Sequence, residues 1–112
     1  MNLQFHQEAL REYDKAMLWY AKRSLSAPFN FEAEVDSVVE RIFANPLAFP
    51  MVYRSKRKAV LKRFPFYLIF ETRSDAVIVF AVAHSKRKAT YWRNRRVYPS
   101  RFPSRRTSGG SS

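Results

Sequence analysis

The sequence contains no cysteine, so neither a disulfide framework nor a thiolate metal site can form. Histidine is almost as scarce, and His6 and His84 alone argue against a histidine-built zinc site. No apolar run approaches the about 20 residues that a membrane-spanning helix needs, and the N-terminus lacks the basic-then-apolar pattern of a signal peptide. We therefore expect a cytoplasmic protein with no metal, no other cofactor and no membrane partner.

Acidic residues are nearly missing from the second part of the chain. Residues 46–112 carry sixteen lysines and arginines but only Glu71 and Asp75 as acids, a net charge of +14. Residues 1–45 carry five basic and seven acidic residues, a net charge of −2. A basic field confined to one part of a protein favours polyanionic partners such as nucleic acid, an acidic protein or an anionic surface. A charge that served only solubility would not need this asymmetry.

The most informative stretch is 76–83, eight consecutive apolar residues rich in β-branched side chains. A run of this length and type predicts an interior strand that is buried on both faces. At its end the sequence changes at once to His-Ser-Lys-Arg-Lys, residues 84–88. A rigid strand that presents polar groups at the edge of a sheet is a common way to hold a site, so we place the candidate site there.

The remaining pattern predicts two helices and three more strands. Apolar residues at three- and four-residue spacing predict helices over 7–23 and 30–44, which a short link joins as an antiparallel hairpin. Alternating residues predict strands over 2–5, 56–63 and 66–72. The fold class that follows is α+β in the order β-α-α-β-β-β. The helical hairpin packs on one face of a small, mainly antiparallel sheet.

The length suits one small domain, which we place at residues 1–96. Within it, residues 89–96 are expected to form a short helix after the last strand. Residues 97–112 are rich in proline, serine, glycine and arginine, a composition typical of a flexible basic tail.

Three motifs carry a resemblance to a known family. They are Ala-Asn-Pro-Leu at 44–47 with Pro50, Lys-Arg-Phe-Pro-Phe-Tyr at 62–67, and Val-Ala-His-Ser-Lys-Arg-Lys at 82–88 with Trp92-Arg93. In this order, in a basic chain of this length, they resemble the RelE/ParE superfamily of toxins from bacterial toxin–antitoxin pairs, often called plasmid stabilisation proteins. The similarity covers roughly residues 1 to 96, and the predicted element order agrees with that family's fold.

The resemblance implies a cognate antitoxin as partner and one of two activities. RelE-like members cut messenger RNA in the ribosomal decoding site, with scattered basic residues and a C-terminal tyrosine or histidine. ParE-like members poison DNA gyrase and are not known as nucleases. For this chain we expect the RelE-like activity, in which a neighbouring 2′-hydroxyl attacks the phosphate of ribosome-bound message. Gyrase inhibition is the alternative, and many nucleolytic members carry an arginine in the third strand where this chain has Tyr67.

Four residues are candidates for catalysis: Arg87, His84, Arg63 and Tyr91. Arg87 matches the basic position that follows the last strand in RelE-like enzymes, and its guanidinium could hold a phosphate and stabilise charge on it. His84 could act as an acid or base at physiological pH, or it could cap the strand end by a hydrogen bond to backbone. Tyr91 could stack on an unpaired base or cover the open face of the sheet.

Seven further basic residues are candidates for nucleic-acid binding: Lys56, Arg57, Lys58, Lys62, Lys86, Lys88 and Arg93. The predicted strand 56–63 would display a basic strip that contacts phosphates without reading sequence, or that is simply a solvated face. We expect an acidic antitoxin segment to neutralise this strip and to lie in a groove beside the helix pair. Trp92 is expected in the core. Glu71 is either a base or the partner of a lysine across the strands.

Overall fold

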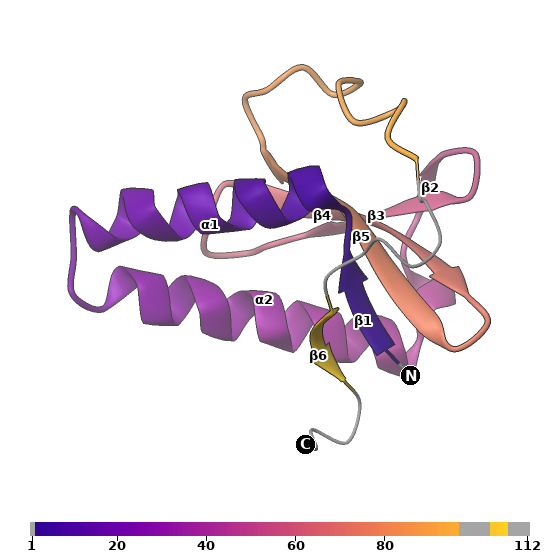
Figure 1. Cartoon of the computed structure of the whole chain (residues 1–112), viewed down its shortest axis with the longest axis horizontal. Coiled ribbons are helices and arrows are strands. Elements are labelled where there is room, and N and C mark those ends of the chain that lie inside the picture. Colours follow the sequence, from indigo (N-terminus) through magenta and orange to yellow (C-terminus); the bar gives the residue numbers. More distant parts are fainter. Residues whose placement is uncertain (1, 97–103, 108–112) are drawn as a thin grey trace.

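The structure is a computed structural model that describes residues 2–96 and 104–107, and in it two helices cover one face of a sheet (Figure 1). The elements in chain order are β1 (Asn2–Phe5), α1 (Gln7–Ala21), α2 (Ala27–Ala44), the short 3₁₀ helix η1 (Pro46–Ala48), β2 (Met51–Tyr53), β3 (Lys56–Val60), β4 (Phe66–Arg73), β5 (Ala76–His84) and β6 (Ser104–Thr107). The predicted β-α-α-β-β-β core is present. The strands β2 and β6 are additions that the sequence pattern did not predict.

The sheet has six strands in the order β2-β3-β4-β5-β1-β6, so β5 lies in its interior as predicted. β5 pairs antiparallel with β4, where Tyr67 lies opposite Ala83, and parallel with β1, where Phe5 lies opposite Val79. The parallel pair is possible because the helical hairpin and three strands return the chain to the starting end of the sheet. The other pairs are antiparallel, and the predicted α+β fold class is confirmed.

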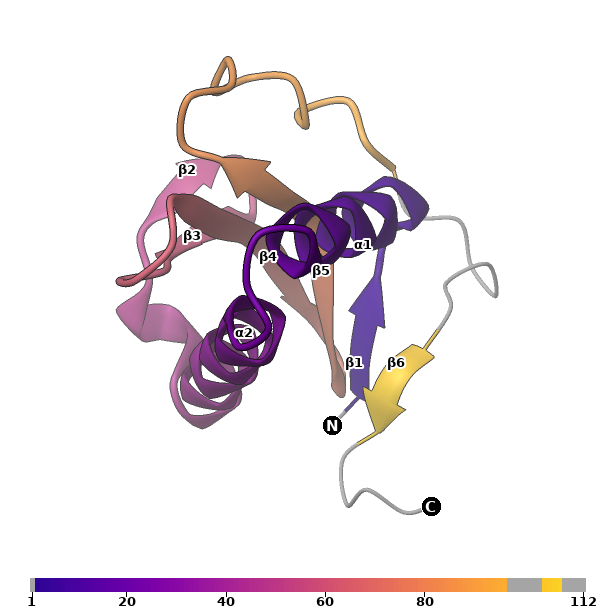
Figure 2. The same ribbon diagram turned by 90° about the vertical axis from the view of Figure 1, so that its left-hand side faces the viewer.

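β5 is apolar throughout because both faces of the sheet are covered. On one face the helices close the main core, in which Val79 shares a cluster with Val35, Val39 and Ile42 of α2. Figure 2 looks along the two helices and shows both on this side of the sheet. On the other face a smaller cluster forms around Ile78 and Phe80 of β5, with β4 residues and Trp92. Trp92 is buried there, which confirms its expected core role.

The two helices differ slightly from their predicted bounds. α1 begins at Gln7, where the Nδ1 atom of His6 accepts a hydrogen bond of 3.0 Å from the backbone N–H of Glu8. α2 begins at Ala27, three residues before the predicted start, because Pro28 falls in the first turn of the helix. At that position a proline is tolerated, since its missing N–H would have no partner inside the helix.

β3 ends at Val60 rather than at residue 63, because the chain turns away from the sheet plane there. The backbone N–H of Leu61 already donates to the carbonyl of Phe66 at 3.0 Å. The backbone N–H groups of Lys62 and Arg63 donate to the carboxylate of Glu34 in α2. This turn fixes the start of β4 beside the end of β5.

The segment after β5 does not form the helix predicted over 89–96. It makes successive tight turns, in which backbone hydrogen bonds join residues three positions apart. One of them runs from the Arg93 N–H to the Thr90 carbonyl at 3.1 Å. A helix of this length is marginal on its own, and the turns let Trp92 reach the sheet. Of the predicted tail, Ser104–Thr107 form β6 on β1, and the rest lies outside the described residues. Over the described part of the chain, no helix has the length and apolarity to cross a membrane.

Candidate functional site at the end of β5

The candidate site lies where β5 runs past the end of its neighbour β1. β1 stops at Phe5, and the backbone N–H of His6 makes the last contact, to the carbonyl of Val79 at 2.9 Å. Beyond that point α1 crosses the free edge of β5. The carboxylate of Glu12 in α1 takes the place of a strand there, because it accepts the backbone N–H of Val82 at 2.9 Å.

Glu12 also holds the C-terminal segment in place. The guanidinium of Arg95 donates to both carboxylate oxygens of Glu12, at 3.0 and 2.8 Å, and to the carbonyl of Phe80 at 2.9 Å. The guanidinium of Arg87 lies 3.5 Å from the same carboxylate. The side chains of Glu12 and Arg95 are only 15% and 13% exposed, so water screens this ion pair little.

Sequence reasoning missed Glu12 and Arg95 as members of the site. One signal was present for Glu12, because it lies between Ala9 and Ala16 on the helix face that the periodicity assigns to the core. A carboxylate on that face needs a partner. Nothing in the sequence pattern singles out Arg95 from the other arginines near it.

Two guanidinium groups lie near the ring of Tyr91. That of Arg87 is 3.6 Å from the centre of the Tyr91 ring, and that of Arg95 is 4.9 Å from it. The Tyr91 hydroxyl is buried close to the Glu12 carboxylate, without hydrogen-bonding geometry to any described residue. Burial, and then the nearby Glu12 carboxylate, raise the pKa of Tyr91 far above its ordinary value of 10.0. Tyr91 therefore stays neutral at physiological pH, and its ring is half-buried against the Arg87 guanidinium.

His84 shapes the turn that follows β5. Its Nδ1 atom accepts the backbone N–H of Lys86 at 3.1 Å, and its carbonyl accepts the backbone N–H of Arg87 at 3.0 Å. Its ring packs on Phe66 with 5.1 Å between ring centres. This is the strand-capping contact that the sequence left open as the alternative to catalysis.

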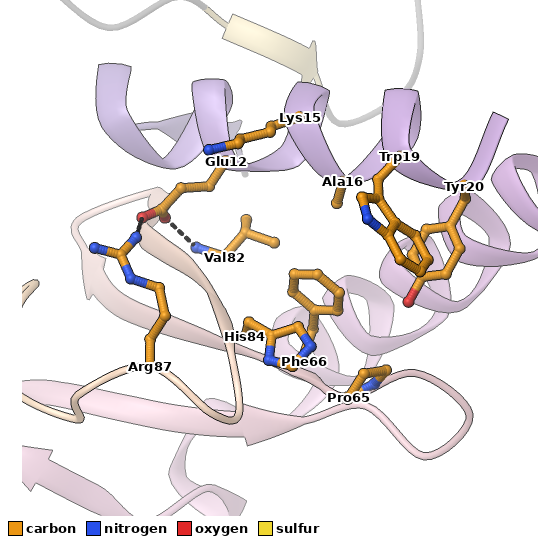
Figure 3. A pocket seen from close by; sticks show the side chains of 10 residues that line it. All are labelled: Glu12, Lys15, Ala16, Trp19, Tyr20, Pro65, Phe66, Val82, His84 and Arg87. Atoms are coloured by element: carbon orange, nitrogen blue, oxygen red, sulfur yellow. Dashed lines mark hydrogen bonds and ion pairs between the residues drawn. The ribbon is translucent and has the colours of Figure 1, made fainter. Parts of the chain in front are cut away.

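A cavity of about 340 Å³ lies between α1 and the end of β5. It is lined by Glu12, Lys15, Ala16, Trp19, Tyr20, Pro65, Phe66, Val82, His84 and Arg87. Figure 3 shows Glu12 and Arg87 together at one end of this cavity and Trp19 and Tyr20 at the other. The structure thus brings His84 and Arg87 to one cavity. Arg63 lies in the neighbouring turn, with an exposed side chain and a backbone N–H that Glu34 accepts.

The predicted basic strip is not continuous, and the largest correction concerns Lys56. Lys56 is buried, and its ammonium group donates to Glu71 at 3.2 Å and lies 4.3 Å from the centre of the Phe80 ring. Glu71 is therefore the cross-strand partner of a lysine. Burial pushes the pKa of Glu71 up, but hydrogen bonds from Arg73, Ser55 and Lys56 outweigh it and hold the pKa below its ordinary value. Lys56 is not available to a nucleic acid, because a buried ammonium needs this carboxylate.

The other basic residues of β3 point in different directions. The guanidinium of Arg57 donates to the Phe49 carbonyl at 2.6 Å, on the side of the main core. The ammonium of Lys58 lies 4.4 Å from the Tyr67 ring, on the opposite face. Alternation along a strand sends neighbouring side chains to opposite faces, which is why the strip divides.

The remaining basic candidates are exposed and lie apart from β3. Lys62 follows β3 in the turn, and Lys86 and Lys88 follow β5. The guanidinium of Arg93 stacks 4.7 Å from the Tyr53 ring. Within residues 2–96 and 104–107, no three histidine, aspartate or glutamate side chains come together as metal ligands would.

Comparisons with known proteins agree on one family. The family model of the ParE toxin of type II toxin–antitoxin systems, parDE, matches residues 3–89. A solved structure described as the chromosomal ParDE toxin–antitoxin system from P. aeruginosa has the same fold, with a TM-score of 0.54 at 18% sequence identity. That match covers 75% of this chain and 95% of the other. No curated protein matches the sequence. The chain therefore belongs to the ParE toxin family of type II toxin–antitoxin systems.

Proposed function

We propose that this toxin acts by binding a protein target, DNA gyrase, and not by cutting RNA. The proposal rests on the contacts that Arg87 makes after the end of β5. Arg87 rests on the Tyr91 ring and faces the Glu12 carboxylate, so its charge is already partly compensated. A residue that must hold a phosphate in a transition state is more effective when its charge is free for that oxygen.

RNA cleavage also needs a proton acceptor and a cationic phosphate ligand, and Tyr91 and Tyr67 do not supply them. The hydroxyl of Tyr91 is buried and its pKa is raised by that burial, so it is a poor proton acceptor at physiological pH. Tyr67 stands where many nucleolytic members carry an arginine, and it is buried under Trp92, 3.5 Å from the indole N–H. Membership of the ParE family favours the gyrase alternative further.

RNA cleavage remains the second candidate because of one specific observation. His84 and Arg87 line the same cavity, so a general acid or base and a phosphate ligand stand together there. A nuclease would need both groups within reach of one phosphate. The cavity is lined mostly by apolar side chains such as Phe66 and Val82, which suits an apolar ligand better than a polyanion.

Two assays on the purified chain separate the candidates. We expect the protein to inhibit supercoiling of relaxed plasmid by gyrase and to leave message intact on programmed ribosomes. Addition of the cognate antitoxin should restore supercoiling. Cleavage of ribosome-bound message together with normal gyrase activity would establish the second candidate instead.

A further inference from the structure

Four exposed apolar side chains lie around the turn between α1 and α2, and we call them the hairpin tip. Leu18 and Trp19 lie near the end of α1, Leu25 in the turn and Phe29 near the start of α2. Leu25 is 93% exposed and Phe29 is 71% exposed. In Figure 1 this turn is the end of the helical hairpin that lies away from the sheet, and in Figure 2 it faces the viewer. Exposed apolar side chains gathered in this way mark interaction sites on soluble proteins.

The backbone of the hairpin tip is ordered by its own hydrogen bonds. The backbone N–H of Ser24 donates to the Tyr20 carbonyl at 3.0 Å. The Ser24 hydroxyl in turn accepts the backbone N–H groups of Ser26 and Ala27, each at 3.2 Å. Leu25 is therefore held outward by a closed turn. A backbone that is already ordered loses little conformational entropy on binding, which favours affinity.

The charged residues within positions 18–29 have one sign, and the nearest acid of α1, Asp14, lies beside Leu18 and Pro28. Lys22 and Arg23 are the charged residues between positions 18 and 29, and both are exposed. The guanidinium of Arg23 stacks 3.6 Å from the centre of the Trp19 ring and donates to the Trp19 carbonyl at 2.8 Å. This cation is thus fixed beside the apolar side chains. A complementary partner surface has an apolar centre and an acidic rim.

The shape of the hairpin tip indicates which kind of partner it fits. Leu25 and Phe29 stand out from the end of the hairpin with most of their surface exposed, so a partner covers them on several sides only with a groove of its own. A segment that folds on binding takes the reverse arrangement and lies in a groove of the protein that it binds. On this ground we infer that the hairpin tip docks into a preformed apolar groove with an acidic rim on the folded target protein. The inference rests on the proposed function, with gyrase as that target.

The test is inhibition of gyrase supercoiling by the full chain carrying Leu25→Ser and Phe29→Ser together. Leu47→Ser is the matched control, because Leu47 is 75% exposed and lies in η1, outside the hairpin turn. We expect the protein concentration for half-inhibition to rise about tenfold or more in the tip variant. In the control it should rise less than about twofold. All three substitutions remove exposed side chains, so thermal unfolding of the two variants should stay close to that of the wild type.

A second pair of variants tests the acidic rim at a single position. Leu25→Glu and Leu25→Lys remove the same apolar side chain but add opposite charges. We expect Leu25→Lys to inhibit gyrase more strongly than Leu25→Glu, by about threefold or more at low salt. Equal inhibition by the two variants would overturn the acidic rim.

The outcomes separate this inference from the proposed function. If the wild type inhibits gyrase and the tip double variant inhibits equally well, the docking surface lies elsewhere while the proposed function stands. If the wild type itself fails to inhibit gyrase, the proposed function falls and this inference falls with it. If the tip variant loses binding to the antitoxin but keeps inhibition, the hairpin tip serves the antitoxin and the inference is wrong.

Discussion

Removal of the Glu12 carboxylate is the sharpest perturbation of the candidate site. In Glu12→Ala the Val82 N–H loses its acceptor and the Arg95 guanidinium loses both of its bonds to the carboxylate. A buried N–H left without a partner costs about 1–3 kcal/mol, and removing one member of a buried ion pair costs about 3–5 kcal/mol. These terms do not add fully, because Arg95 keeps its bond to the Phe80 carbonyl. We expect the free energy of unfolding to fall by about 3–5 kcal/mol.

Urea denaturation measures this loss, with two variants for comparison. Glu12→Gln keeps an acceptor for the Val82 N–H and should lose about 1–2 kcal/mol. Glu8→Ala is the control, because Glu8 forms an exposed pair with Arg11 one turn earlier on α1, and its change should stay within about 0.5 kcal/mol. A Glu12→Ala protein as stable as the Glu8→Ala control would refute the view that this network holds the C-terminal segment to the sheet.

Four further predictions test other parts of the molecule. Val79→Asp places a carboxylate in the main core and should destabilise the protein by at least about 3 kcal/mol or abolish folding; normal thermal unfolding would show that β5 is not central. If ribosome-bound message is cut at all, Arg87→Ala should lose about 10²–10³ in rate and Lys86→Ala far less, and equal losses would mean that only the overall charge acts. Burial lowers the pKa of His6 below 6.5, so the folded state binds fewer protons than the unfolded state. The free energy of unfolding should then fall as the pH drops from 7 through 6.5 towards the folded-state pKa, and His6→Asn, which keeps an N-cap acceptor, should flatten this slope in urea titrations. Association with the antitoxin, followed by stopped flow, should slow clearly between low and near-physiological salt while the dissociation rate stays nearly constant; an association rate indifferent to salt would contradict recruitment by the basic part of the chain.

The elements with strong local patterns were predictable from the sequence. The apolar run that became β5, the stripe of Val35, Val39 and Ile42, and the family motifs depend on residues close in the chain. Helix and strand periodicities express such local order directly. The order of elements and the position of β5 inside the sheet follow from them, because each apolar face must be covered.

The composition of the site was decided by contacts between distant parts of the chain. Arg95 meets Glu12 across 83 positions, and Lys56 meets Glu71 only because β3 and β4 pair side by side. A charge in the sequence looks the same whether it will be exposed or buried, so Lys56 was expected on the surface. The free edge of β5 beyond β1 exists only in the assembled sheet, and it is this edge that gives the Glu12 carboxylate its partner.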